Sequence, residues 1–220
     1  MEFETSEFET GDIILFEHIS QEKKTWKQKI YNFIDNVIKG VTKSKYNHVG
    51  IIIKNPPWNK ELKGLFFLES NSEPIPDSED HKKKFGVQLI PLNYVLQEKS
   101  KENNLYYRKL NCVRDEKFQE TMCEIHTTIH NKPYDTNIVD WFHAAIDLQN
   151  QDKIPKQQKV HKTNCFWCSA LVSYIYCKLG FLDKDIPWTI ISPSQLGSEL
   201  NHHNLKFKNC KVESEKKINK

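Results

Sequence analysis

Apolar residues occur along this chain in two patterns, as short uninterrupted runs and as longer segments in which they recur every three or four positions. A run of four to eight apolar residues between turn residues is typical of a buried strand. On this basis the sequence predicts strands over residues 13–16, 49–53, 65–68, 87–92 and 105–110. The second and third are joined by a turn-rich segment, which predicts an antiparallel hairpin.

The three- and four-residue spacing predicts amphipathic helices. Residues 25–38 have this spacing, and Gly40 stands where such a helix would end. Three further segments, in which apolar residues recur at this spacing or form a long stretch, predict helices over residues 118–129, 138–148 and 165–179. The polar, proline-containing residues 70–84 predict a mobile surface loop.

The order of these elements predicts one α+β domain in which an antiparallel sheet packs against helices. A chain of 220 residues lies within the size range of a single domain with its own core. We divide it into an acidic N-terminal segment (residues 1–10), the domain itself (residues 11–205) and a lysine-rich tail (residues 206–220). Because the tail lacks apolar periodicity, we expect it to be flexible.

Composition narrows the classes of function. Only two of the 32 basic residues are arginine, which argues against nucleic-acid recognition. No basic stretch followed by an apolar run opens the chain, and no run reaches the roughly 18 apolar residues of a membrane span. We therefore expect a cytoplasmic protein without stable membrane insertion, in which the six cysteines are free thiols.

The strongest chemical signal is Cys168, which stands at the start of an apolar helical segment. The positive end of a helix lowers the pKa of a thiol and favours the nucleophilic thiolate. His48 opens the strand 49–53 and can accept the thiol proton, and Glu69 ends the adjacent strand and can orient the imidazole. Each residue alone also has an ordinary structural role, so the argument rests on the three together.

Further short segments accompany these residues in a fixed order. They are Gly11-Asp12, His48-Val49-Gly50-Ile51, Phe67-Leu68-Glu69-Ser70, Gly86-Val87-Gln88-Leu89-Ile90-Pro91-Leu92, Tyr134-Asp135, Cys168-Ser169-Ala170-Leu171-Val172 and Ser192-Pro193-Ser194-Gln195-Leu196. In kind and order these segments resemble the circularly permuted NlpC-type papain-like proteins, a family that includes the YiiX-like group and is related to lecithin retinol acyltransferase. In the unpermuted relatives the cysteine precedes the histidine, whereas here His48 precedes Cys168.

The resemblance implies a papain-like cysteine hydrolase with Cys168 as nucleophile, His48 as base and Glu69 as orienting group. Its substrates would be a peptide, another amide or an acyl lipid, cleaved through an acyl-enzyme intermediate without a cofactor. Two alternatives stay open: an acyltransferase or lipid-modifying enzyme on the same scaffold, and a catalytically silent binding protein. Neither the natural substrate nor the oligomeric state follows from the sequence.

Several neighbouring residues are candidates for the binding site. Tyr46 and Asn47 precede the histidine and offer a phenol and an amide, while Tyr134 and Asp135 match a segment that lines the cleft in the family. Cys165 lies one turn before Cys168 on the expected helix. It has three possible roles: a packing residue, a disulfide partner of Cys168, or the true nucleophile.

Two patterns invite a metal or redox interpretation. His126 and His130 stand four apart on an expected helix, but no carboxylate or cysteine lies at the usual zinc spacing, so we expect solvated side chains. The pair Cys165-x-x-Cys168 lacks both a second ligand pair and the strand that precedes a thioredoxin-like motif. The sequence therefore predicts no metal site.

Overall fold

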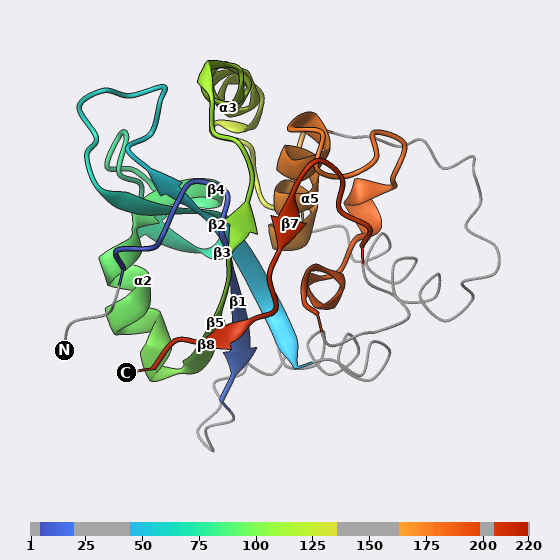
Figure 1. The fold of residues 1–220 in the computed structure, drawn as a ribbon. Coiled ribbons are helices and arrows are strands. Elements are labelled where there is room, and N and C mark those ends of the chain that lie inside the picture. The colour runs from blue at the N-terminus through green and yellow to red at the C-terminus, as the bar shows by residue number, and fades with distance from the viewer. Residues whose placement is uncertain (1–4, 20–44, 136–162, 199–204, 220) are drawn as a thin grey trace.

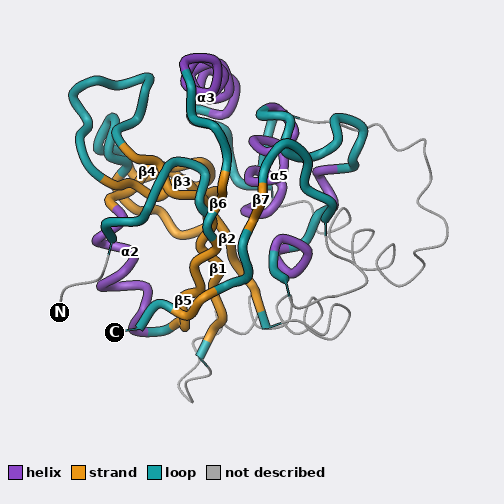
Figure 2. The backbone as a smooth tube through the Cα atoms, in the orientation of Figure 1, coloured by secondary structure: helices purple, strands orange, loops and turns teal. Residues whose placement is uncertain are grey.

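An antiparallel sheet forms the centre of the protein in the computed structural model, which describes residues 5–19, 45–135, 163–198 and 205–219 (Figures 1 and 2). Its strand order is β4-β3-β2-β1-β5-β8, and each strand pairs antiparallel with its neighbours. The six strands are β1 (Ile13–His18), β2 (Tyr46–Lys54), β3 (Leu65–Pro76), β4 (Lys83–Pro91), β5 (Asn103–Arg108) and β8 (Lys216–Lys217). A separate short pair joins β6 (Leu110–Asn111) to β7 (Lys211–Val212).

The sheet carries a hydrophobic core on each face because successive residues of a strand point to opposite sides. Ile13 and Leu15 of β1 belong to the core shared with α3 (Glu116–Ile129) and α5 (Cys168–Lys178). Ile14 and Phe16 belong to the core shared with α2 (Leu92–Glu98). The predicted combination of an antiparallel sheet with helices is therefore confirmed.

The strands are longer than the sequence predicts. β3 continues to Pro76 and β4 begins at Lys83, so most of the expected loop over residues 70–84 is paired strand. Ser70 pairs with Val87, and after an irregularity Ile75 pairs with Lys84. Backbone pairing tolerates the polar side chains of this segment, and the single buried apolar residue, Ile75, anchors it to the core.

The described helices match the predictions in part. α3 is confirmed and begins after Asp115, whose side chain accepts a hydrogen bond from the Phe118 amide as an N-cap. α5 begins at Cys168 rather than at residue 165, so Cys165 is not part of a helix. The helices expected over residues 25–38 and 138–148 lie outside the described residues.

Four short helical segments were not predicted from the sequence. The α-helix α2 is only seven residues long, and the remainder are single turns of 3-10 helix: η1 (Lys99–Lys101), η3 (Trp188–Ile190) and η4 (Pro193–Leu196). Segments this short contain too few apolar residues to establish a helical period. Among the described residues, no helix is long and apolar enough to cross a membrane.

The expected flexible tail is instead part of the fold. β7 pairs with β6, and β8 adds to the edge of the sheet beside β5. Between these strands, Glu215 accepts hydrogen bonds from the Tyr46 hydroxyl and the Ser198 amide. The tail has few apolar residues and is held by backbone pairing and polar contacts. Hydrophobic periodicity does not detect contacts of this kind, so the sequence did not predict them.

Candidate active site

Strands β2 and β3 bring His48 and Glu69 together. In the register that pairs Ile51 with Leu68, His48 lies diagonal to Glu69 on one face of the sheet. The His48 Nε2 atom is 2.5 Å from Glu69 Oε2. The two side chains are 19% and 2% exposed, so this contact is largely removed from water.

Two amides hold the second oxygen of the Glu69 carboxylate. Glu69 Oε1 accepts a hydrogen bond of 2.8 Å from Gln88 Nε2 on β4 and one of 3.1 Å from Asn71 Nδ2. Burial alone would raise the pKa of Glu69, but the positive charge of His48 and these hydrogen bonds outweigh it and lower the pKa. The carboxylate is therefore held ionised, with one oxygen directed at the imidazole.

His48 also contacts the cysteine. The charge of Cys168 acts on the imidazole, and the contact of Nε2 with Glu69 leaves the other ring nitrogen, Nδ1, available to the thiol. Burial lowers the pKa of His48, but the negative charges of Cys168 and Glu69 outweigh this effect and raise the pKa from 6.5 to about 10. Phe16 packs against the imidazole in an edge-on arrangement, with ring centroids 5.0 Å apart. The imidazolium form is therefore favoured at this site.

Cys168 is the first residue of α5, after Trp167 in an extended N-cap conformation. The first turn of this helix contains no acidic residue, and Cys168 is 4% exposed. The neighbouring Ser169 hydroxyl donates a 2.6 Å hydrogen bond to the Ile191 carbonyl. The helix start is thus fixed in position, and its partial positive charge lies at the thiol.

Tyr134 and Asp135 flank the segment that leads into α5. The Asp135 amide donates to the Phe166 carbonyl, and the Tyr134 amide donates to the Phe85 carbonyl on β4. Ser70 on β3 adds a 2.6 Å hydrogen bond from its hydroxyl to the same Phe166 carbonyl. The predicted pair therefore lies beside the residues just before Cys168, where it connects the sheet to the start of the helix.

Tyr46 and Asn47 have different surroundings from each other. Tyr46 is buried and its hydroxyl donates a 3.0 Å hydrogen bond to Glu215, so the phenol faces the C-terminal segment. Asn47 is the extra residue in the irregular pairing of β1 with β2, which matches Phe16 with His48 and Glu17 with Tyr46. Its buried Oδ1 accepts no hydrogen bond from the described residues. A binding role for either residue stays a prediction.

Cys165 is a partly buried cysteine outside any disulfide, three positions before α5. Because the helix begins at Cys168, the prediction that Cys165 lies on the same helix, one turn earlier, is wrong. The structure contains Cys165 and Cys168 as separate thiols rather than as a disulfide.

Sequence reasoning missed the groups that hold Glu69. Gln88 belongs to one of the quoted segments but had no assigned role, and Asn71 lies in the segment taken for a loop. The spacing of Asn71 two residues after Glu69 on an extended strand would have placed both side chains on one face. No sequence signal indicates that Gln88 lies opposite them, because that depends on strand register.

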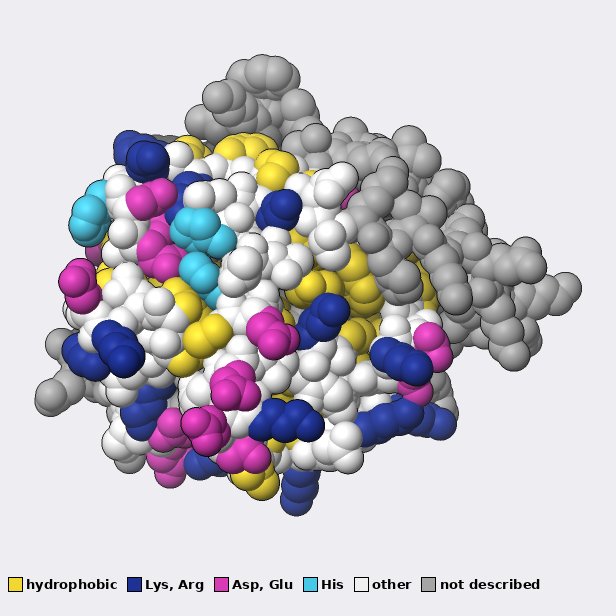
Figure 3. Space-filling model, turned by 90° about the horizontal axis from the view of Figure 1, so that it is seen from above, with side chains coloured by type: hydrophobic (Ala, Val, Ile, Leu, Met, Phe, Trp, Pro, Cys, Tyr) yellow, Lys and Arg dark blue, Asp and Glu magenta, His cyan; other side chains and the backbone are white. Residues whose placement is uncertain are grey.

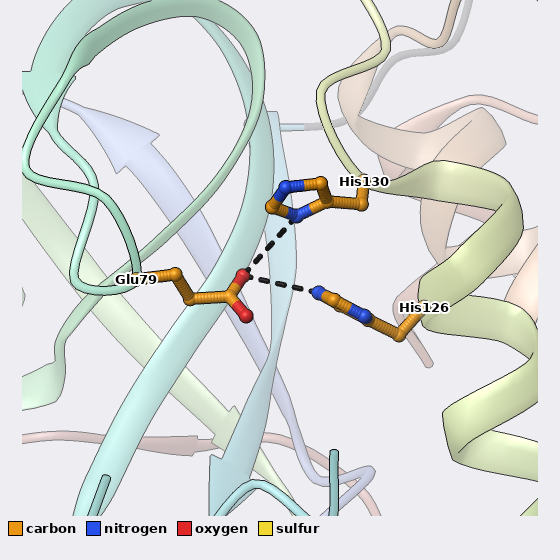
Figure 4. A group of neighbouring side chains, drawn as sticks. All are labelled: Glu79, His126 and His130. Carbon is orange, nitrogen blue, oxygen red and sulfur yellow. Dashed lines mark hydrogen bonds and ion pairs between the residues drawn. The ribbon is translucent and has the colours of Figure 1, made fainter. Parts of the chain in front are cut away.

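The expectation for His126 and His130 also needs correction. His126 lies on α3 and His130 is its C-cap residue, and both rings face Glu79, which lies on the loop between β3 and β4 (Figure 4). The carboxylate is 47 residues away from His126 in the chain, far outside any local spacing pattern. Within the described part of the chain, Glu79, His126 and His130 together could hold a metal ion.

Comparison with known proteins gives no relative for this chain: no protein-family model, no curated protein and no solved structure matches it. The site is therefore interpreted from its own geometry: a cysteine at a helix start lies near a histidine, and that histidine contacts a buried carboxylate.

Proposed function

We propose that the protein is a cysteine-nucleophile hydrolase of amide or ester bonds, built on a circularly permuted NlpC-type papain-like fold. One observation carries this proposal: the His48 imidazole contacts the buried carboxylate of Glu69 and lies within electrostatic reach of Cys168 at the first position of α5. A nucleophile, a base and an orienting group in this relation form the arrangement that activates a thiol for acyl transfer.

In the proposed reaction, the Cys168 thiolate attacks the carbonyl carbon while His48 holds the proton taken from the thiol. The first backbone N–H groups of α5 have no acceptor within the helix, so they can donate to the oxyanion that forms. His48 then gives its proton to the leaving amine or alcohol, and the acyl group remains on the sulfur. Transfer of that group to water completes hydrolysis, whereas transfer to another acceptor would make the protein an acyltransferase.

We assign the nucleophile to Cys168 rather than Cys165. Cys168 occupies the helix start and its charge acts on His48, whereas Cys165 lies outside the helix. Glu69 acts through His48, since its Oε2 contacts the Nε2 atom and leaves Nδ1 available to the thiol. In this proposal β2 carries the base, β3 the orienting carboxylate and α5 the nucleophile.

Trapping of the acyl-enzyme tests this proposal. The protein is incubated with peptide-amide, isopeptide and acyl-lipid ester substrates, quenched in acid, and examined by intact and peptide mass spectrometry. We expect an acyl adduct on Cys168 with at least one class, its absence in Cys168→Ala, and its persistence in Cys165→Ala. An adduct confined to Cys165, or no adduct together with no turnover of any class, contradicts the proposal and favours a silent binding protein.

A further inference from the structure

We propose that Glu79, His126 and His130 form a binding site for a divalent transition-metal ion, with zinc as the expected occupant. The three side chains converge from two segments: His126 projects from α3, His130 from its C-cap, and Glu79 from the loop between β3 and β4 (Figure 4). Their potential ligand atoms all lie within 4.8 Å of one another. This inference is independent of the proposed hydrolase activity.

The distances suit a small ion. Glu79 Oε2 is 3.1 Å from His126 Nε2 and 3.4 Å from His130 Nδ1. In tetrahedral coordination with bonds of 2.0–2.1 Å, two ligand atoms lie about 3.3 Å apart. The carboxylate and each imidazole are thus already at coordination spacing, and a single cation can replace the protons that otherwise mediate these contacts.

A second layer of contacts holds Glu79 in this orientation. Trp58 Nε1 donates a 2.9 Å hydrogen bond to Glu79 Oε1, which leaves Oε2 for the histidines. The indole also stacks on His126, with ring centroids 4.4 Å apart and planes inclined by 11°. Outer contacts of this kind fix the direction of metal ligands and strengthen metal affinity.

The loop that carries Glu79 is itself fixed to the sheet. Asp77 Oδ1 accepts a hydrogen bond from the Glu79 amide, and Asp77 Oδ2 accepts one from the Leu89 amide on β4. Burial raises the pKa of Glu79, but the hydrogen bond and charge of His126, together with His130, outweigh it and lower the pKa. An ionised carboxylate is therefore held beside two imidazoles on a rigid support.

The cluster is accessible to an ion from solvent. The side chains of Glu79, His126 and His130 are 12%, 17% and 33% exposed. The view onto the α3 side of the molecule has histidine side chains next to acidic ones at the surface (Figure 3). An ion bound by these three ligands keeps an open position for water.

The ligand set selects the kind of metal. Two imidazoles and one carboxylate favour zinc, copper, nickel, cobalt or iron, whereas magnesium and calcium prefer sites made of oxygen ligands. His130 lies at the end of α3, just before the segment 132–135 that pairs with β4 and with Phe166. A bound ion would therefore tie this connection to the β3–β4 loop and stabilise it.

Metal binding to the untagged, EDTA-treated protein tests the site. Zn²⁺ is titrated by calorimetry, and its coordination is determined by X-ray absorption. We expect one ion per chain with nitrogen and oxygen neighbours at about 2.0–2.1 Å. Glu79→Gln and His126→Asn should each weaken affinity by about 100-fold or more, and Trp58→Phe by roughly 10-fold, as for outer contacts of metal sites.

The controls separate this site from the thiols and from misfolding. His18→Ala removes a histidine at the end of β1, outside the cluster, and should leave Zn²⁺ affinity unchanged. Zn²⁺ should raise the melting temperature of the wild type and of His18→Ala but not of Glu79→Gln, whose apo form should melt like the apo wild type. The absence of binding, unchanged affinity in Glu79→Gln and His126→Asn, or sulfur neighbours at about 2.3 Å would each overturn the proposal. None of these readouts depends on turnover.

Discussion

At the scale of single residues, Glu69 is the group on which the imidazole orientation depends. Replacing it by glutamine in the variant Glu69→Gln removes the negative charge that faces His48 Nε2, while the amides of Asn71 and Gln88 stay in place. We expect catalytic turnover to fall by roughly 10²–10⁴-fold, the range for loss of acid–base assistance. The measurement is the steady-state rate on the substrate class that acylates Cys168.

Glu17→Gln is the matched control for this change. Glu17 is a strand carboxylate on β1 that accepts hydrogen bonds from Asn104 and Tyr106 on β5. Its replacement should leave turnover within about twofold, since distant surface changes rarely exceed ±0.5 kcal/mol. Equal losses in Glu17→Gln and Glu69→Gln would contradict an orienting role for Glu69.

The pKa of His48 gives a second prediction at this scale. A folded-state pKa of about 10, above the ordinary 6.5, means that the protonated imidazole stabilises the fold. This stabilisation is fully present below pH 6.5 and is lost as the pH rises toward 10. Nitrogen NMR of the imidazole should therefore record its titration near pH 10, and Cys168→Ala should move it downward because the thiolate charge is removed. A midpoint near 6.5 in the wild type would contradict the ion pair.

The sequence indicated the three residues of the proposed site but not the residues that hold them. Cys168 begins α5 and His48 lies near the start of β2, whereas Glu69 lies within β3, which continues past the predicted end of the strand to Pro76. Gln88 donates a hydrogen bond to the Glu69 carboxylate, yet this contact depends on the register of β3 against β4. Glu79 illustrates the same limit, because its histidine partners lie on a helix far along the chain.

At the scale of elements, Ser70 joins β3 to the segment that leads into α5. Its fully buried hydroxyl donates to the Phe166 carbonyl. Ser70→Ala should lower the free energy of unfolding by about 1 kcal/mol, the net value of a typical hydrogen bond. Denaturant unfolding measures this change.

Ser72→Ala on the same strand provides the comparison. Ser72 is partly exposed, so its loss should change the free energy of unfolding by less than about 0.5 kcal/mol. If both serine variants unfold alike, the Ser70 contact does not hold the two elements together.

Elements were predictable where their periodicity extended over enough residues. α3 shows four buried apolar residues at helical spacing and was predicted with nearly its observed bounds. α2 buries only Leu92, Val95 and Leu96 within seven residues, too few to distinguish a helix from the end of a strand. The outer part of the β3–β4 hairpin was missed because its polar residues are paired through the backbone.

At the scale of the whole molecule, the C-terminal segment completes the sheet and reaches the strand that carries His48. Glu215 is 6% exposed and accepts hydrogen bonds from Tyr46 on β2 and from the Ser198 amide, with Arg108 Nε at 3.8 Å. Glu215→Gln should lower the free energy of unfolding by about 2 kcal/mol, since hydrogen bonds to a charged group are worth about 1.5–3 kcal/mol. Chemical denaturation with matched slopes gives this value.

Glu213→Gln tests whether any acidic residue of this segment would have the same effect. The Glu213 side chain is 34% exposed, and its carboxylate accepts a hydrogen bond from Asn111. We expect its replacement to lower the free energy of unfolding much less than Glu215→Gln does, because contacts of exposed charges contribute little. A flexible tail would make both substitutions neutral, and that outcome would contradict the observed pairing.

The general architecture was predictable, whereas the position of the tail was not. Alternating and continuous apolar runs define an antiparallel sheet with helices because burial of apolar surface dominates folding. The tail contributes little apolar surface and was therefore invisible to that criterion. Its strands β7 and β8 are two residues each and add backbone hydrogen bonds at the edges.

The central claim is that His48 and the start of α5 activate Cys168, and site-resolved alkylation tests it most directly. Cys177, near the other end of the same helix, is the internal control, since burial and the charge of Asp183 raise its pKa to about 12. The rate of iodoacetamide reaction at each cysteine is measured by mass spectrometry at neutral pH in the wild type and in His48→Ala. We expect Cys168 to react faster than free cysteine and much faster than Cys177, and we expect His48→Ala to abolish the difference. A Cys168 rate no higher than that of free cysteine and unchanged in His48→Ala would rule out activation of this thiol.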